Sequence, residues 1–211
     1  MRKLYVIVVV LMGFKATAQT NPRLAKTIDS LYTADQAVQL KFKEMHEQNA
    51  PADSIKKQET LKNETFVRNI KIVKDIYAKY GYPTFKMIGK EASNNFFVLI
   101  QHADKDLSFQ QQILPVLDKL SKKGQASRRN YAYLYDRVQR NSGGKQLYGT
   151  QLTFSPKTGL FDANNKIVYP PDLADPEHVN ARRKSVGLEP IEEYYETTAA
   201  FLGWKRPPSK N

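Results

Sequence analysis

Apolar residues recur every three or four positions over most of the chain, which is the spacing of one face of an α-helix. Asn49 to Pro51 interrupts the first apolar stripe, Asp53 or Ser54 is positioned to cap a second helix, and Gly81 ends it. We expect these two long helices to pack as an antiparallel pair. The residues of the two stripes are Leu24, Ile28, Leu31, Val38, Phe42 and Met45, followed by Phe66, Ile70, Val73, Tyr77 and Tyr80.

Shorter helical patterns and one alternating segment fill the rest of the chain. Pro115 either kinks the helix that contains it or starts a new segment. Residues 146–154 alternate loosely and could pair with residues 166–169 as a β-hairpin. Helices are expected over Ala92–Ala103, from Asp106 onward, over Arg128–Arg140, from Asp175 or Pro176 to Arg183, and from Pro190 to Phe201.

These patterns predict the fold class. The chain is expected to be mainly α: a single helical domain of about six to eight helices over residues 19–202, with a small β-hairpin insert near residues 146–169. Residues 203–211 are expected to form a flexible tail. One position in the first stripe is polar, because Asp35 lies between Leu31 and Val38. A buried carboxylate is costly unless it is paired, so Asp35 either meets a polar partner or faces a polar cavity; fixing the register of the helix is the alternative role.

The first eighteen residues have the pattern of a signal peptide. Arg2 and Lys3 precede an apolar run from Leu4 to Phe14 that is too short to cross a bilayer. Ala-Thr-Ala at residues 16–18 supplies the small residues that signal peptidase requires. The sequence therefore predicts export to the periplasm or beyond after cleavage following Ala18, with no transmembrane segment in the mature chain; an uncleaved N-terminal anchor is the alternative.

Charge narrows the class of partner. The chain has 33 Lys and Arg against 21 Asp and Glu, a formal charge of +12. Loss of Arg2, Lys3 and Lys15 with the signal peptide would leave 30 basic residues and a charge of +9. This excess favours an anionic small molecule or an anionic envelope polymer, although a solvated lysine-rich surface would give the same count. Nucleic acid is not expected, because the chain is predicted to be exported and aromatic residues do not alternate with its basic runs.

Several chemistries are excluded by composition. The chain has no cysteine, so disulfides, thiol nucleophiles and zinc sites with thiolate ligands cannot form. Its only histidines are His46, His102 and His178, which excludes a histidine-rich metal site. No nucleotide-binding loop is present. The cofactor is therefore unknown; a divalent metal on His102, Asp104 and Asp136 is possible but not favoured.

The segment Gln101-His102-Ala103-Asp104 carries the candidate acid–base chemistry. Histidine is the side chain whose unperturbed pKa lies near neutrality, and a neighbouring carboxylate can orient its ring. We therefore interpret His102 as a candidate general base or acid, with Asp104 or Asp35 as its orienting carboxylate. A histidine that only stabilises the C-terminus of its helix is the structural alternative.

Two later segments add polar groups. Tyr133, Asp136, Arg137 and Arg140 share the face of the fifth predicted helix that is opposite to its apolar stripe. Arg137 suits a bidentate anion contact, although the whole face could be a solvent-exposed ladder of ion pairs. Two amides, a phenol and a hydroxyl then surround Gly149, where another group can approach the backbone closely. An ordinary strand is the structural alternative for that second segment, which is Gln146-Leu147-Tyr148-Gly149-Thr150-Gln151.

Together these motifs resemble a bacterial family catalogued as domain of unknown function 6624, from about Asp35 to Tyr194. The matching signatures are Asp35-Gln36, Tyr80-Gly81-Tyr82-Pro83-Thr84, Gln101-His102-Ala103-Asp104, Phe109-Gln110, Leu114-Pro115, Tyr133-Leu134-Tyr135-Asp136-Arg137, Gly144-Lys145-Gln146-Leu147-Tyr148-Gly149-Thr150-Gln151, Asp175-Pro176, Arg182-Arg183 and Gly187-Leu188. Gln39 departs from the arginine expected after the Asp-Gln pair. The resemblance implies no activity, but it points to His102, Asp136, Arg137 and Gln151 as one shared site.

Three functions remain open from the sequence. The first is an envelope hydrolase or transferase that acts on an anionic or carbonyl-bearing substrate, with catalytic candidates His102, Asp104, Asp136 and Asp35. The second is a non-catalytic module that binds an anionic envelope ligand, and the third is a helical interaction protein with an internal polar network. The substrate-binding candidates are Gln101, Gln110, Tyr133, Arg137, Gln146, Tyr148, Thr150 and Gln151.

Overall fold

The computed structural model describes residues 20–153, 159–162 and 166–202. The described residues are mainly α-helical, which confirms the predicted fold class. The predicted signal peptide and the whole of the predicted tail lie outside them. The helices are α1 (Pro22–Glu47), α2 (Ala52–Tyr80), α3 (Phe85–Ile88), α4 (Lys90–Gln101), α5 (Leu107–Lys122), α6 (Arg128–Asn141), the 3₁₀ helix η1 (Pro176–His178), α7 (Val179–Ser185) and α8 (Ile191–Phe201).

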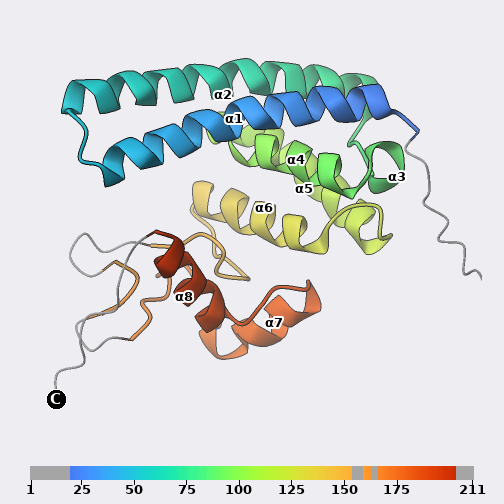
Figure 1. The fold of residues 1–211 in the computed structure, drawn as a ribbon. Coiled ribbons are helices and arrows are strands. Elements are labelled where there is room, and N and C mark those ends of the chain that lie inside the picture. Colours follow the sequence, from blue (N-terminus) through green and yellow to red (C-terminus); the bar gives the residue numbers. More distant parts are fainter. Residues whose placement is uncertain (1–19, 154–158, 163–165, 203–211) are drawn as a thin grey trace, which may run out of the picture.

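The two long N-terminal helices run antiparallel and cover one side of α4 (Figure 1). The Asn21 side chain caps α1 by accepting a hydrogen bond from the backbone N–H of Leu24 at 3.0 Å. Helix α2 begins directly after Pro51, without the predicted side-chain cap from Asp53 or Ser54, and ends at Gly81. Gly81 has a φ of 69°, a conformation that favours glycine and stops the helix.

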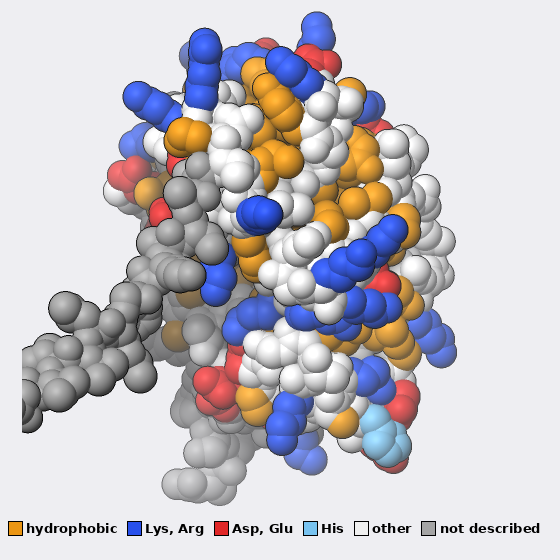
Figure 2. Space-filling view, turned by 90° about the vertical axis from the view of Figure 1, so that its right-hand side faces the viewer, with side chains coloured by type: hydrophobic (Ala, Val, Ile, Leu, Met, Phe, Trp, Pro, Cys, Tyr) orange, Lys and Arg blue, Asp and Glu red, His pale blue; other side chains and the backbone are white. Residues whose placement is uncertain are grey.

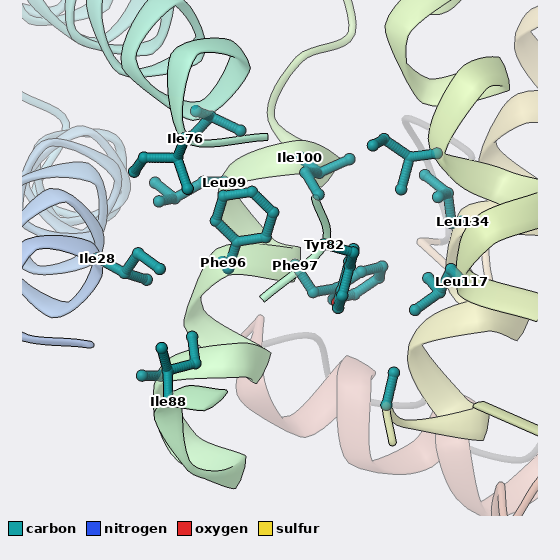
Figure 3. Close-up of a cluster of buried hydrophobic side chains, with 14 of the residues drawn as sticks. Ile28, Ile76, Tyr82, Ile88, Phe96, Phe97, Leu99, Ile100, Leu117 and Leu134 are labelled. Carbon is teal, nitrogen blue, oxygen red and sulfur yellow. The ribbon is translucent and has the colours of Figure 1, made fainter. Parts of the chain in front are cut away.

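Helix α4 lies at the centre of the main hydrophobic core. It presents Phe96 and Ile100, both fully buried, to neighbouring helices on several sides (Figure 3). The same cluster takes Ile28 from α1, Leu117 from α5 and Leu134 from α6. Because one short helix contacts four of the others, it fixes the positions of residues at its C-terminal end, where the Gln101–Asp104 segment begins.

Helix α5 is continuous through Pro115, so Pro115 does not start a new segment. The helix begins at Asp106, whose carboxylate accepts a hydrogen bond from the backbone N–H of Phe109 at 3.2 Å. The same carboxylate accepts one from the Lys74 ammonium at 2.7 Å and one from the Ser108 hydroxyl at 2.8 Å. The hydrogen bond from Lys74 is the largest cause that lowers the pKa of Asp106 below its ordinary value.

Replacement of Asp106 by asparagine should make unfolding less dependent on acidic pH. Because the pKa of Asp106 is lowered in the folded state, the ionised carboxylate contributes stability above pH ~4, which is the ordinary pKa of an aspartate. This contribution is lost as the pH falls through the lowered pKa of the folded state. Asparagine still caps the helix but cannot ionise. We expect Asp106→Asn to lower the free energy of unfolding by about 0.5 kcal/mol at pH 7, with the difference disappearing near pH ~3. Urea denaturation at both pH values, with the exposed Asp53→Asn as control, measures this; an equal difference at both would contradict it.

Helix α6 is buried on two sides. Leu134 and Val138 face the main core, whereas Ala132 packs with Tyr148 in a separate cluster formed by the C-terminal part of the chain. The segments that contain α7 and α8 lie on the side of α6 that faces away from α1 and α2 (Figure 1). The side of α6 that carries Tyr133 and Asp136, for which a solvent-exposed ladder of ion pairs was the alternative, is therefore covered.

The predicted β-hairpin is not formed by the described residues. Gln146 instead bridges Leu173 in the parallel direction, with hydrogen bonds from Gln146 N to Asp172 O and from Ala174 N to Gln146 O. Phe161 and Ile167 form an isolated antiparallel bridge. The predicted pairing of residues 146–154 with 166–169 is not shown among the described residues, because the segment after Gln146 is held by Asp136 of α6 and Gln146 itself pairs with residues 172–174.

The basic residues are dispersed. On the face shown in Figure 2, Lys and Arg side chains are scattered among apolar, uncharged and acidic ones rather than gathered into one patch. Many of the helical lysines lie on the solvent side of α2, as a solvated surface would require. Of the described helices, none combines the length and apolar composition needed to cross a bilayer.

Candidate functional site

A buried carboxylate and a half-buried imidazole form the centre of the candidate site. Asp35 lies on the core side of α1, and its side chain is 1% exposed. His102 directly follows α4, where its backbone N–H bonds to the Val98 carbonyl. Its ring nitrogen Nδ1 lies 2.8 and 2.9 Å from the two oxygens of Asp35. Gln36 donates a further hydrogen bond to the Asp35 carboxylate at 2.9 Å. Of the alternatives left open for Asp35, the structure shows a polar partner, which is His102.

The remaining contacts of His102 fix its ring and leave one nitrogen accessible. The imidazole stacks on Phe66 of α2, with centroids 4.7 Å apart and planes 20° from parallel. Nε2 has no hydrogen-bond partner among the described residues, and it is not among their buried unpaired atoms. Because Nδ1 faces a carboxylate, the neutral ring carries its proton there and Nε2 keeps its lone pair. Such a ring can accept a proton from a bound molecule.

An ion pair lies next to this histidine. The Arg137 Nη1 lies 2.8 and 2.7 Å from the two oxygens of Asp104, and it also donates to the Gln101 carbonyl at 3.2 Å. Gln110 is fully buried and donates to the backbone carbonyls of Ile100 and Gln101. Asp104 is therefore the partner of Arg137 and not the orienting carboxylate of His102.

These groups line a hollow of about 530 Å³, which we name the polar hollow. Three cationic side chains, those of Lys62, Lys105 and Arg137, reach it. Its apolar wall comes from α2, including Phe66. The full lining consists of Gln39, Lys62, Asn63, Phe66, Val67, Ile70, His102, Ala103, Asp104, Lys105, Asp106 and Arg137. A volume of this size is sufficient for a small organic ligand.

Asp136 belongs to a different, fully buried network. Its carboxylate accepts hydrogen bonds from the backbone N–H groups of Leu147, Tyr148 and Thr150 at 2.8–3.1 Å, and from the Thr150 hydroxyl at 3.0 Å. Burial raises the pKa of Asp136, while these four hydrogen bonds act in the opposite direction. All its strong acceptor directions are used by the protein, so this carboxylate holds the 147–150 loop against α6.

The other residues predicted near Gly149 complete this loop. Gln146 is fully buried and donates to Asp172 and to the Gln151 carbonyl, while its own oxygen accepts from the Gln151 N–H. The Tyr148 carbonyl accepts a hydrogen bond from the buried Arg183 at 2.7 Å. Gly149 has a φ of 64°. A Cβ at this glycine would come within 2.5 Å of Ile191, so the close backbone approach is to α8 and not to a ligand.

The predicted single site is thus divided into two places. His102, Asp35, Asp104, Arg137, Gln101 and Gln110 meet at the C-terminal end of α4, whereas Asp136, Gln146, Tyr148, Thr150 and Gln151 form the loop network on the other side of α6. Tyr133 joins neither group; its ring lies edge-on to Tyr194 at 6.2 Å, and burial raises its pKa.

The proposed metal variant does not fit this arrangement. It required His102, Asp104 and Asp136 to converge, but Asp136 is saturated by the 147–150 loop and Asp104 is paired with Arg137. Among the residues that the structure describes, no three His, Asp or Glu side chains lie close enough to share an ion.

Two contributors to the site were not identified from the sequence. Phe66 lies in the apolar stripe of α2, so its position predicted only a core contact. Lys62, one turn earlier, is one of many lysines on that helix, and its ammonium lies 3.7 Å from the centre of the Phe42 ring. Neither residue has a local signal, because each acquires its role only when α2 packs beside the end of α4.

Comparison with known proteins identifies the family but no activity. No curated protein and no solved structure matches the chain. The profile of a family of unknown function, DUF6624, matches residues 22–206 and confirms the resemblance seen in the sequence. The chain belongs to the DUF6624 family.

Proposed function

We propose that the protein is a hydrolase or group transferase that acts on an anionic ester outside the cytoplasm, with His102 as its general base. The observation that carries this proposal is the Asp35–His102 pair: a carboxylate that is 1% exposed holds Nδ1, and the 19% exposed imidazole lines the polar hollow. The export signal predicted over residues 1–18 supplies the location.

Each step of hydrolysis can be assigned to a group in the hollow. Nε2 of His102 takes a proton from a water molecule as the water oxygen adds to the acyl carbon or phosphorus of the ester. The bond to the alcohol oxygen then breaks, and the imidazolium returns the proton to that oxygen. Asp35 stabilises the transient positive charge on the ring. In a transferase, another hydroxyl replaces the water.

The cations at the rim favour a negatively charged substrate. Arg137 donates through Nη1 to Asp104, whereas its Nη2 has no partner among the described residues and is not buried. Lys105 is exposed, and it forms no ion pair with any other described residue. An anionic group could therefore bind beside His102 without displacing Asp104.

The same cations support a second candidate, a module that binds an anionic envelope ligand without turnover. Lys62, Lys105 and Arg137 would bind the ligand in either case. The two functions differ in the role of His102, because only an enzyme needs the lone pair of its Nε2 to accept a proton.

Turnover of chromogenic esters separates the two functions. We expect the mature protein to release nitrophenolate from at least one of 4-nitrophenyl acetate, 4-nitrophenyl phosphate and bis(4-nitrophenyl) phosphate. His102→Gln should lower kcat/KM for that ester by about 10²–10⁴-fold. The matched control is His178→Gln, because His178 also pairs with a carboxylate, that of Asp175 at 2.9 Å, but is 71% exposed and outside the hollow.

Two outcomes would contradict the proposed enzymatic function. One is the absence of turnover of all three esters by the wild type, and the other is equal turnover by wild type and His102→Gln. If calorimetry then showed that 4-nitrophenyl phosphate binds and that Lys105→Gln weakens it, the binding module would be the function.

A further inference from the structure

A second hollow adjoins the polar hollow at His102. It has a volume of about 750 Å³ and lies between α1 and the end of α8, and we name it the apolar groove. His102 and Gln39 line both hollows, so the two meet at these residues. A molecule longer than the polar hollow would extend past the imidazole into the groove.

The exposed surface of the groove is mostly apolar, although Thr33, Gln36 and Lys43 also line it, whereas the polar hollow is lined by several charged residues. Leu40 of α1 is 65% exposed and Phe201 of α8 is 67% exposed, although both are large apolar residues. Tyr32, Ala37 and Leu202 line the same groove. Exposed apolar side chains that gather around one hollow are a feature of binding surfaces.

The two sides of the groove lie close together. The Lys43 ammonium of α1 lies 4.7 Å from the centre of the Phe201 ring, and the end of α8 is directed toward α1 in Figure 1. The groove is therefore bounded by two helices from opposite ends of the chain, and a single apolar chain could contact both.

Most of the charged lining residues lie on the other side of His102, in the polar hollow. The carboxylate of Asp106 is engaged by Lys74 and that of Asp104 by Arg137, which leaves Lys105 and the outer nitrogen of Arg137 to receive an anion. Among the described residues that line the groove, Lys43 is the only Lys, Arg, Asp or Glu, and it pairs with Glu47 at 2.8 Å. An anion is therefore favoured in the polar hollow and an apolar chain in the groove.

We infer that the substrate is an anionic ester with one long apolar acyl chain. The anionic alcohol part occupies the polar hollow, the acyl chain occupies the apolar groove, and the ester carbonyl lies at His102 between them. Water adds to the acyl carbon, the bond to the alcohol oxygen breaks, and the products are a fatty acid and an anionic alcohol. This inference rests on the proposed function, because it assigns the substrate class of the same site.

Binding of a simple amphiphile tests the inference without turnover. Isothermal titration calorimetry of the mature protein would use n-octyl phosphate, n-octyl glucoside and inorganic phosphate, each below its micelle concentration where it has one. We expect octyl phosphate to bind at least about tenfold more tightly than either partial probe, because only it places groups in both hollows.

Substitutions at exposed positions test which end of octyl phosphate binds in the polar hollow and which in the apolar groove. Leu40→Ser and Phe201→Ser should each weaken octyl phosphate about fivefold, and Lys105→Gln should weaken it by a similar factor. Leu61→Ser is the matched control, because Leu61 is 48% exposed on α2 but lines neither hollow. It should leave the affinity unchanged.

The two proposals fail in different ways. If octyl phosphate binds no more tightly than inorganic phosphate, or if Leu40→Ser and Phe201→Ser behave like Leu61→Ser, the acyl-chain assignment is wrong even when nitrophenyl esters are hydrolysed. If octyl phosphate binds as expected but His102→Gln turns over every ester at the wild-type rate, the groove assignment stands as a binding site and the proposed reaction is wrong.

Discussion

Replacing Asp136 with alanine is expected to lower the free energy of unfolding by about 3–5 kcal/mol, the largest stability effect of any single change considered for this protein. The carboxylate is fully buried and accepts three backbone N–H hydrogen bonds and one hydroxyl hydrogen bond from the 147–150 loop. Alanine would leave those donors buried without an acceptor. It would also leave a cavity between α6 and the loop.

Urea denaturation at pH 7 measures this effect. Asp136→Asn keeps the volume and one acceptor oxygen, so it should be less destabilising than alanine. Asp53→Ala, at an exposed position in the first turn of α2, is the control and should cost less than about 1 kcal/mol. A loss below about 1 kcal/mol for Asp136→Ala would show that the loop does not depend on this carboxylate.

Replacing Asp35 with asparagine is expected to lower kcat by about 10²–10⁴-fold on the ester that the wild type hydrolyses best, with little change in KM. The substitution keeps the size of the side chain but removes the charge that opposes the imidazolium. An amide can also donate to Nδ1, which would place the ring proton on Nε2 and remove the base. Under the proposed function, Asp35 is a positioning residue that acts through His102.

A structural role for Asp35 would give a different result. The asparagine variant should remain folded, with its free energy of unfolding within about 1 kcal/mol of the wild type, because it can still accept the hydrogen bond from Gln36. Asp175→Asn, in the exposed pair with His178, is the control and should not change kcat. A wild-type kcat in Asp35→Asn, or a lost kcat accompanied by global unfolding, would contradict the positioning role.

The helices could be predicted from sequence because their signals are local. The apolar spacing over residues 24–45, the caps at Asp106 and Gly81, and the breaks near Pro51 and Pro190 each act within a few residues of the element they define. The β-hairpin predicted after α6 is not shown among the described residues, for the opposite reason. The conformation of the loop after α6 is set by side chains of α6 and α7 rather than by alternation within the segment.

The candidate site shows the same division. The interruption of the α1 stripe at Asp35 indicated a polar partner, and the His-x-Asp segment indicated acid–base chemistry, but nothing local connects the two. Asp136 and Arg137 are adjacent on α6, yet one is enclosed by the 147–150 loop and the other reaches Asp104. Neighbouring helical residues point about 100° apart, so two residues that are adjacent in sequence need not belong to the same site.

Local patterns in the sequence are enough to place the longer helices, to name the residues with reactive groups and to exclude thiol chemistry, although the short helix α3 was not predicted. The packing of the helices sets which carboxylate holds His102, that of Asp35 and not that of Asp104, and it places Asp136 and Gln151 in the loop network. The reason is that periodicity reports which side of a helix is covered, whereas hydrogen bonds over 67 positions of sequence depend on which helices pack together.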